Sequence, residues 1–200
     1  MPHTLCFETI CVENRVLKNL SYHEARLNHT RSALYGFTDS WNLSELLTLP
    51  DLLENGLYKC RVAYEREIDN IKWELYAPRT IRKIQRVYHD TIDYAFKYDD
   101  RAALNTLFAQ RGNADEILII KNKMVTDSCY CNTAFFDGKR WITPSAPLLH
   151  GTQRAFLLDN GTLEEAEIKE DAISGFSHIK LFNAMINWEN APALDIDTIA

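Results

Sequence analysis

The sequence predicts an α+β fold in two lobes, and two patterns along the chain support this prediction. Both halves carry strand-like and helix-like segments. The strands are joined by hairpin signals and not by the regular strand–helix–strand order of a parallel sheet. We expect a small N-terminal α+β lobe over residues 1–90 and a C-terminal lobe over residues 91–200. A chain of 200 residues is long enough for two such lobes.

The composition is that of an ordinary globular protein. Hydrophobic residues make up 46% and charged residues 25% of the chain, and the formal net charge is −6. This negative charge argues against nucleic acid or an anionic membrane as the main partner. The sequence has no apolar run near the ~20 residues of a membrane span and no signal-peptide pattern at its start.

The cysteines predict reduced thiols and no metal site. Their number is five, which is odd, and no signal peptide precedes them, so a cytoplasmic location is expected. Cys129 and Cys131 form a Cys-x-Cys pair, but a zinc site would need a second pair. We expect two small side chains on a strand instead.

The N-terminal half predicts a sheet with helical insertions. A capping box at Ser21 and Glu24 predicts a helix over residues 22–35, and residues 37–56 are expected to be helical in two pieces. Apolar runs and alternation predict four strands, over residues 5–12, 15–20, 57–66 and 71–81.

Basic residues gather around the last two of these strands, namely Lys59, Arg61, Arg66, Arg79, Arg82, Lys83 and Arg86. One interpretation is the solvated face of a sheet, and the other is a surface that binds carboxylates. Arg61 and Arg66 are candidates for the carboxylates of a substrate, and the sequence does not decide between them.

The C-terminal half predicts further strands and two helices. A helix over residues 101–111 is expected to be capped by Asp99 or Asp100. The continuous apolar run 115–121 predicts a central buried strand, and Asp137-Gly138 predicts a two-residue hairpin. Another helix is expected over residues 151–158, strands over residues 124–127, 130–136, 139–143, 163–169 and 178–185, and a partly loose tail from residue 187 onward.

Three features between residues 95 and 154 carry candidate chemistry. Lys97 follows an apolar segment and precedes Arg101; it is either a solvated surface charge or an amine with a lowered pKa that attacks an aldehyde. Asp127 either caps a turn or holds a proton on a cofactor ring nitrogen. Gly151-Thr152-Gln153 begins a helix, where backbone amides bind phosphate. An amine, an acid and a helix N-terminus together suit pyridoxal phosphate.

Taken in order, these segments resemble the class IV aminotransferase family, the fold-type IV pyridoxal-phosphate enzymes. The similar segments are CFETICVEN, the His-x-x-Arg-Leu of NLSYHEARLN, Lys97 with the helix after it, ADEILIIKN, VTDSCYCNTAFF and WITPSAPLLHGTQR. The resemblance covers nearly the whole chain. It implies a two-lobed fold like that of D-amino acid aminotransferase, with a shortened N-terminus because the family's opening hairpin does not precede Phe7.

The resemblance also implies roles for individual residues. Lys97 would be the catalytic residue that binds pyridoxal 5'-phosphate covalently, and Asp127 would lie at the ring nitrogen. The phosphate would be held by Arg26, Cys131, Asn132 and the start of the helix at Gly151, Thr152 and Gln153. Two of these positions depart from the family pattern, since Asp127 replaces the usual glutamate and Cys131 the usual serine.

The spacing of Lys97 and Arg101 is most similar to that of aminodeoxychorismate lyases. These enzymes convert 4-amino-4-deoxychorismate to 4-aminobenzoate and pyruvate, a step in folate biosynthesis. The alternatives are an amino acid aminotransferase of the branched-chain or D-amino acid type and a non-catalytic homologue that acts as a binding protein. The resemblance further implies a small-molecule amine or carboxylate substrate and a homodimer.

Overall fold

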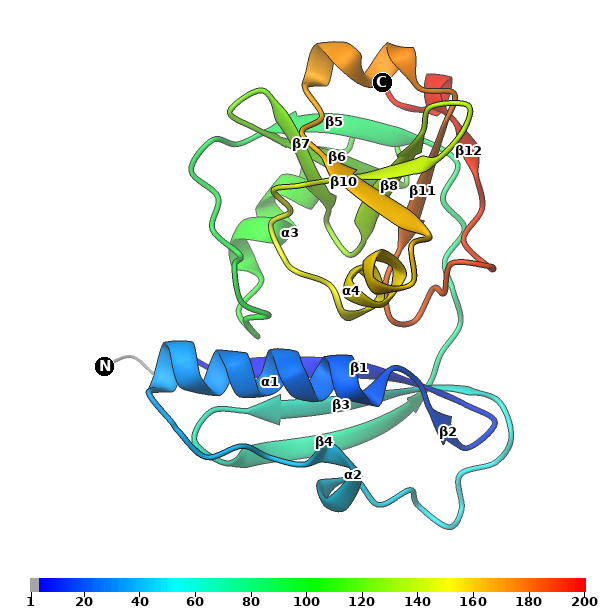
Figure 1. The fold of residues 1–200 in the computed structure, drawn as a ribbon. Coiled ribbons are helices and arrows are strands. Elements are labelled where there is room, and N and C mark those ends of the chain that lie inside the picture. Colours follow the sequence, from blue (N-terminus) through cyan, green and yellow to red (C-terminus); the bar gives the residue numbers. More distant parts are fainter. Residues whose placement is uncertain (1–3) are drawn as a thin grey trace. The chain divides into compact units, whose positions relative to one another are not determined.

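The computed structural model describes residues 4–200, which form two compact units (Figure 1). Unit 1 contains the chain up to Pro78 together with Phe96–Asp100, and unit 2 contains Arg79–Ala95 and Arg101–Ala200. The mixture of helices and several sheets is the expected α+β class.

The division differs from the expected lobes 1–90 and 91–200 for a reason of strand pairing. The strand β5 (Ile84–Tyr88) pairs in parallel with β6 (Glu116–Lys121), which lies much later in the chain and belongs to unit 2. Residues 96–100 return to unit 1 because Tyr98 forms a bridge with Cys6. Local sequence patterns do not contain these long-range pairings.

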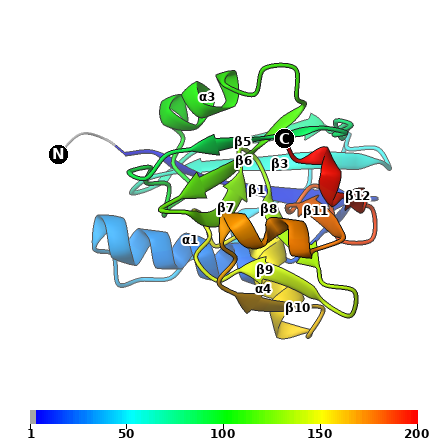
Figure 2. The same cartoon turned by 90° about the horizontal axis from the view of Figure 1, so that it is seen from above.

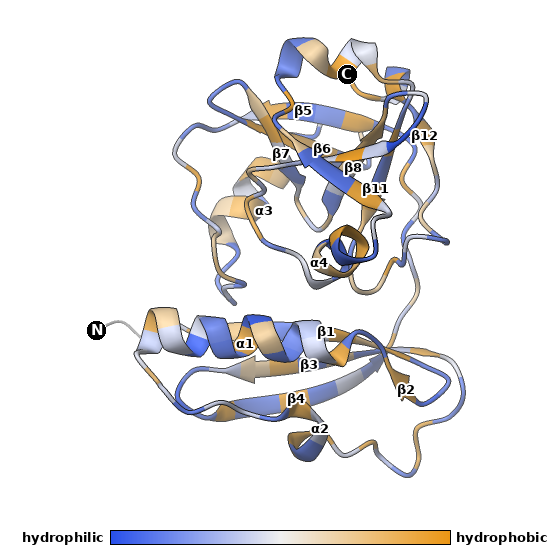
Figure 3. Cartoon of the chain, viewed as in Figure 1, coloured by the Kyte–Doolittle hydropathy of each residue, from blue (hydrophilic) through white to orange (hydrophobic). Residues whose placement is uncertain are grey.

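Unit 1 is an antiparallel sheet with a long helix along one face. The strand order is β2-β1-β3-β4, with β1 at Cys6–Glu13, β2 at Val16–Leu17, β3 at Leu57–Tyr64 and β4 at Ile68–Leu75. The helix α1 (Leu20–Tyr35) contributes Leu27 to the core, and Figure 3 shows its mixed polar and apolar colouring. Alternate residues of β1 fill that core because side chains of a strand alternate between its faces; Cys6, Glu8, Ile10 and Val12 are all fully buried.

Two predicted helical features of unit 1 are wrong. Helix α1 begins before the expected capping box, with Asn19 as its N-cap, and the Glu24 carboxylate accepts a hydrogen bond from the Leu43 amide at 2.8 Å. Residues 37–56 contain only the short helix α2 (Leu43–Leu46). The segment after it is irregular, and its carbonyl groups at Pro50, Asp51 and Leu53 accept hydrogen bonds from Arg15 instead of continuing a helix.

Unit 2 contains two sheets that share a core. The three-stranded sheet has the order β5-β6-β7, with β7 at Met124–Ser128, so β6 is central as predicted. The five-stranded sheet has the order β10-β9-β8-β11-β12, with β8 at Asn132–Phe136, β9 at Trp141–Pro144, β10 at Leu163–Ala166, β11 at His178–Phe182 and β12 at Leu194–Asp195. Leu118, Ile120 and Val125 of the first sheet pack with Phe135 and Ile179 of the second.

Two helices flank these sheets. The helix α3 (Ala102–Ala109) contacts β6, and Figure 2 shows it on the outer side of β5 and β6. The helix α4 (Thr152–Asp159) contacts β10, and its Leu157 packs with Ala134 and Phe182. A 3-10 helix, η1, spans Glu170–Gly175, and a second, η2, spans Ile196–Thr198.

Three details of unit 2 differ from the expectations. Phe136 pairs with Trp141, so the hairpin loop has four residues and not two, and the Asp137 carboxylate accepts amide hydrogen bonds from within the loop. The N-cap of α3 is Arg101, with no capping aspartate. The tail is fixed, since Ile199 forms a bridge with Ile84, and the Ala200 amide donates to the Ile84 carbonyl oxygen at 2.9 Å.

Within residues 4–200, no helix is long and apolar enough to cross a membrane. The same residues contain no group of three or more histidine, cysteine or acidic side chains placed to hold a metal ion.

Candidate cofactor site

In unit 1, the predicted phosphate ligand Arg26 is paired with a buried acid, Glu8. Arg26 Nε donates to Glu8 Oε1 at 2.9 Å, and Arg26 Nη2 lies 2.5 Å from Glu8 Oε2. His23 Nδ1 lies 2.7 Å from the same Oε2. Burial by itself would raise the pKa of Glu8, but the charge of Arg26 and the hydrogen bonds from His23 and Arg26 lower it to about 2. Glu8 is therefore an anion that fixes the plane of the Arg26 guanidinium.

His23 is fully buried beside this pair. Burial is the largest cause that lowers the pKa of His23, and the positive charges of Arg26 and Lys97 lower it further, against the opposing effect of Glu8. A neutral His23 donates from Nδ1 to Glu8. Glu8 was not among the predicted site residues, although its position offered a signal. It stands two residues from Cys6 and from Ile10, on the core-facing side of a strand where an acid is costly unless paired.

Lys97 lies beside β1 in the segment that returns to unit 1. Its carbonyl oxygen accepts a hydrogen bond from the Phe7 amide at 3.0 Å. Its Nζ lies 4.8 Å from the centre of the Phe7 ring, a cation–π contact. The side chain is half-buried. Since the charges of Lys97 and Arg26 both act on His23, the two predicted site residues lie in the same part of unit 1.

The two arginines predicted for substrate carboxylates lie in different surroundings. Arg61 forms an ion pair with Asp99, and its guanidinium lies 4.5 Å from the centre of the Phe7 ring. Arg66 is exposed in the turn between β3 and β4. The charge of Arg61 is thus already compensated by an acid of the same unit.

In unit 2, Asp127 and Asn132 form a buried polar set with the loop before α4. Asn132 Nδ2 donates to Asp127 Oδ1 at 2.8 Å and to the Leu149 carbonyl oxygen at 2.9 Å. The Leu149 amide donates to Asp127 Oδ2 at 2.9 Å. Burial raises the pKa of Asp127 to about 6, although these hydrogen bonds and the charge of Arg154 oppose the shift. Asp127 is an acid whose charged form lacks a cation of its own at close range.

The start of α4 joins this set through Gly151. A Cβ atom at Gly151 would lie 1.9 Å from Asn132 Oδ1, so only glycine fits while Asn132 holds Asp127. Gly151 is the N-cap, the first turn of α4 has no acid, and the next two residues, Thr152 and Gln153, are buried. The positive end of this helix is therefore not neutralised by an acid in its own first turn.

Arg154, the third residue of α4, is a buried cation that was not among the predicted site residues. It is 4% exposed, and its Nη2 donates to the Pro144 carbonyl oxygen at 2.9 Å and to Glu165 Oε2 at 2.7 Å. Gly151 and Arg154 are three residues apart and share a helix face, which was the available signal. The positive charge of Arg154 also acts on Asp127.

Cys131, predicted near the phosphate, packs in the core of unit 2 with Phe135 and Leu181. Its Sγ lies 3.3 Å from Asn183 Nδ2, and burial raises the pKa of the thiol to about 12. It is a neutral, buried thiol. All five cysteines are free and buried.

Comparison with known proteins identifies the family. Residues 5–190 match the family model described as amino-transferase class IV, so the chain belongs to this family, whose members depend on pyridoxal phosphate. Its two-unit α+β architecture is the fold of that family.

Three relatives show where the chain stands within the family. A Haemophilus influenzae protein of undetermined function is 44% identical over 181 residues, which are 90% of this chain and 96% of the relative. A Haemophilus somnus protein with the provisional name 4-amino-4-deoxychorismate lyase is 33% identical, and its crystal structure matches with a TM-score of 0.84 over 94% of this chain and 99% of that one. A Schizosaccharomyces pombe protein provisionally named aminodeoxychorismate lyase is 34% identical over 88 residues, 41% of this chain and 38% of the relative.

Proposed function

We propose that this chain is a pyridoxal-phosphate enzyme that converts 4-amino-4-deoxychorismate to 4-aminobenzoate and pyruvate, a step that supplies folate synthesis. The observation that carries the proposal is the likeness to the Haemophilus somnus protein with that provisional name, at 33% identity over nearly the whole length of both chains. The Lys97-x-x-x-Arg101 spacing supports the same choice.

The buried acid of unit 2 suits this cofactor. When bound, the cofactor supplies an electron sink for the carbanion that forms at the substrate. Asp127 accepts hydrogen bonds from the Asn132 side chain and the Leu149 amide, and a carboxylate can accept more than these two. A protonated ring nitrogen would give Asp127 the cation that its raised pKa indicates it lacks. Asp127 would thus hold a proton at the ring nitrogen.

Arg26 and the start of α4 are the phosphate ligands of the proposal. Glu8 takes two of the five donors of the Arg26 guanidinium and fixes its orientation, which leaves its outer donors in a defined plane. The backbone amides at Gly151, Thr152 and Gln153 contribute the positive end of α4. Cys131 and Asn132 contribute to the proposed site by fixing the connection between β7 and β8. The Cys131 amide donates to Ser128 Oγ, and the Asn132 side chain donates to Asp127.

Lys97 is the catalytic residue of the proposal. Its amine would hold the cofactor covalently, and the free amine would act as the general base and acid that takes up and returns the proton of the substrate carbon. The cation–π contact with Phe7 keeps the amine beside β1.

Covalent labelling tests the cofactor and Lys97 together. We would incubate the purified protein with pyridoxal phosphate, follow the yellow colour, reduce with borohydride and map the modified peptide by mass spectrometry. A pyridoxyl label on Lys97 that is absent from Lys97→Ala is expected, with Lys123→Ala, which changes a lysine of the β6–β7 turn, as the matched control. Labels spread over several lysines would contradict the proposal and favour a non-catalytic binding protein.

The reaction is tested by pyruvate release. Protein that binds pyridoxal phosphate at Lys97 should form pyruvate from 4-amino-4-deoxychorismate without any added 2-oxo acid. Product formation that requires a 2-oxo acid would identify an amino acid aminotransferase instead, because only transamination needs a second substrate to accept the amino group. We also expect a homodimer, as the family implies, and light scattering that gives the mass of a single chain would contradict this expectation.

A further inference from the structure

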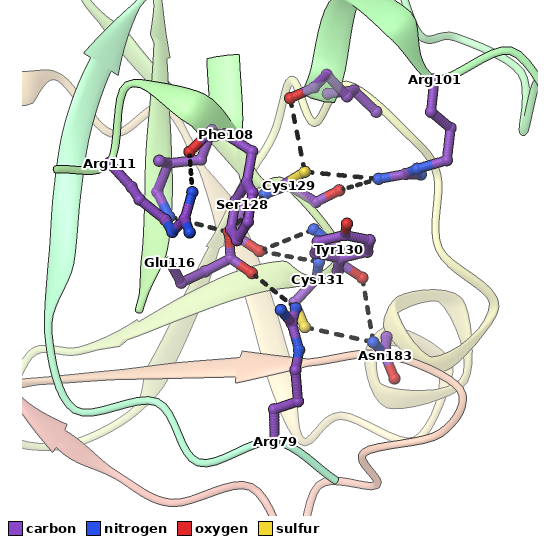
Figure 4. A network of polar contacts seen from close by, with 12 residues as sticks. Arg79, Arg101, Phe108, Arg111, Glu116, Ser128, Cys129, Tyr130, Cys131 and Asn183 are labelled. Atoms are coloured by element: carbon purple, nitrogen blue, oxygen red, sulfur yellow. Dashed lines mark hydrogen bonds and ion pairs between the residues drawn. The ribbon is translucent and has the colours of Figure 1, made fainter. Parts of the chain in front are cut away.

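Unit 2 carries an exposed aromatic ring between two arginines, in the turn that joins β7 to β8 (Figure 4). The guanidinium carbons of Arg79 and Arg101 lie 4.8 Å and 4.7 Å from the centre of the Tyr130 ring. The Phe108 ring meets Tyr130 edge-on at 5.7 Å between centres. Tyr130 is 43% exposed, which is high for so large a side chain. We call these four residues the Tyr130 cluster.

Arg101 is held in place by neutral groups only. Its Nη1 donates to the Tyr94 hydroxyl at 3.1 Å, and its Nη2 donates to the Cys129 carbonyl oxygen at 2.7 Å. Burial works against its charge, but these partners and Tyr130 raise the pKa of Arg101 overall, so it stays a cation. Within residues 4–200, no carboxylate forms an ion pair with it. The charge of Arg101 is thus not used in an ion pair, and a carboxylate beside Tyr130 would form a charge-assisted hydrogen bond with it.

Glu116 lies beside Arg79, and it does not compensate both arginines. Glu116 is fully buried, and its Oε1 accepts from the amides of Ile117 at 2.9 Å and Cys129 at 3.3 Å. Its Oε2 makes no hydrogen bond and lies 3.7 Å from Arg79 Nη2. Burial raises the pKa of Glu116 against the effect of the two arginines. Two guanidinium groups thus share one acid whose charge burial disfavours, and the cluster is positive.

The turn that carries Tyr130 is fixed on both sides. Ser128 Oγ accepts a hydrogen bond from the Cys131 amide at 2.9 Å, and Asn183 Nδ2 donates to the Tyr130 carbonyl oxygen at 3.1 Å. This turn follows Ser128, the last residue of β7, and precedes Asn132, the first residue of β8. An anion bound beside Tyr130 would therefore lie next to the end of β7, the strand that carries the proposed ring-nitrogen acid, Asp127.

We propose that Arg79 and Arg101 bind a carboxylate group of the substrate at the Tyr130 cluster and thereby select carboxylate substrates. This inference rests on the proposed function, because it assigns the substrate contact of the same enzyme. Arg101, preorganised by Tyr94 and Cys129, is the main ligand. Arg79 contributes less, since its side chain is 58% exposed and already lies near Glu116. Arg61, by contrast, is paired with Asp99.

The test compares a carboxylate with its neutral analogue on the cofactor-loaded protein. We would measure binding of 4-aminobenzoate and 4-aminobenzamide by calorimetry to the wild type, Arg101→Met, Arg101→Lys and Arg79→Met. Arg82→Met is the matched control, because Arg82 is an exposed arginine close in sequence and outside the cluster. Loading is checked in every variant by the pyridoxyl label on Lys97.

The wild type should prefer 4-aminobenzoate to 4-aminobenzamide. Arg101→Met should lower the affinity for 4-aminobenzoate by about tenfold or more, because a charge-assisted hydrogen bond contributes roughly 1.5–3 kcal/mol. The affinity for 4-aminobenzamide should not change. Arg79→Met should lower the affinity for 4-aminobenzoate by roughly threefold. Arg101→Lys should bind 4-aminobenzoate more tightly than Arg101→Met does, and Arg82→Met should bind both ligands as the wild type does. In turnover, Arg101→Met should raise KM more than it lowers kcat.

Two results would overturn the inference. One is a wild type that binds both ligands equally, and the other is an Arg101→Met protein that loses both ligands to the same degree, as a merely structural role predicts. Either result leaves the label on Lys97 in place. Absence of that label in the wild type would instead be a failure of the proposed function.

Discussion

Asn132 donates a hydrogen bond from Nδ2 to Oδ1 of Asp127 at 2.8 Å, and this bond joins the start of β8 to the end of β7. The same Nδ2 reaches the Leu149 carbonyl oxygen, and the Leu149 amide binds the other oxygen of Asp127. One amide and one acid thus connect the two strands to the loop that leads into α4.

Replacing Asp127 with asparagine should change the pH dependence of stability. The pKa of Asp127 is raised from 3.8 to about 6, so the folded protein binds this proton more tightly than the unfolded chain does. The stability that the protonated acid contributes is complete below pH 3.8 and is lost as the pH rises through 6. At pH 7.5 this loss in the free energy of unfolding amounts to roughly 3 kcal/mol. The Asp127→Asn variant should not show the loss, because asparagine does not ionise.

Urea unfolding of the apoprotein between about pH 4 and 7.5 measures this difference. The free energy of unfolding of the wild type should fall relative to Asp127→Asn over that range. Asp171→Asn, which changes an exposed acid of η1, serves as the control. If the free energy of unfolding has the same pH dependence in the wild type and in Asp127→Asn, Asp127 does not have a raised pKa in the folded protein.

Gly151→Ala should disrupt the hydrogen bonds among Asp127, Asn132 and Leu149. The new Cβ would meet Asn132 Oδ1 at 1.9 Å, and Asn132 could give way only by breaking its bonds to Asp127 and Leu149. We expect a loss of about 1–3 kcal/mol in stability, typical of overpacking, and weaker binding of pyridoxal phosphate in a fluorescence titration. Gly175→Ala is the control, because nothing lies within 4 Å of a Cβ placed there. Equal behaviour of the two variants would refute this account of Gly151.

Glu8→Gln should destabilise unit 1 and remove an acid-dependent transition. The pKa of Glu8 is lowered from 4.5 to about 2, so its contribution is present above pH 4.5 and is lost as the pH falls toward 2. Removing one partner of a buried ion pair costs about 3–5 kcal/mol, and Arg26 would lose its anion. Thermal unfolding at pH 7 and pH 3 measures both effects.

Glu13→Gln offers the comparison for Glu8→Gln. Glu13 lies on the same strand, is 43% exposed and pairs with Lys18 at 3.3 Å. A surface pair of this kind contributes roughly 0–1 kcal/mol, so this variant should unfold almost as the wild type does. A Glu8→Gln protein as stable as Glu13→Gln would contradict the assigned role of Glu8.

The five thiols should resist modification in the folded protein. All are buried, and burial is the largest cause that raises their pKa values, to about 11 for Cys11 and Cys129 and about 12 for Cys60 and Cys131. Since the thiolate is the reactive form, a disulfide reagent at pH 8 should modify the folded protein on the order of 100-fold more slowly than the urea-unfolded chain. A thiol that reacts at once in the folded protein would disprove the burial of that cysteine.

Periodicity predicted most of the strands and helices. Strong alternation identified β3, and the continuous apolar run identified β6 as a central strand, because those patterns are imposed by burial of particular faces. The capping box predicted at Ser21 and Glu24 does not form, because the Glu24 carboxylate accepts a hydrogen bond from the Leu43 amide instead. The helix expected after Pro50 failed for a similar reason, since Arg15 binds the carbonyl groups of that segment.

The sequence by itself determined the family and the order of the candidate residues, because Lys97, Asp127 and Gly151-Thr152-Gln153 stand in segments whose residue types chemistry constrains. The tertiary structure decided how each is held. It paired Arg26 with Glu8, placed Asn132 on Asp127, and left Arg101 among neutral partners. These contacts join residues far apart in the chain, and their energies depend on burial and on partner charges, which local sequence does not specify.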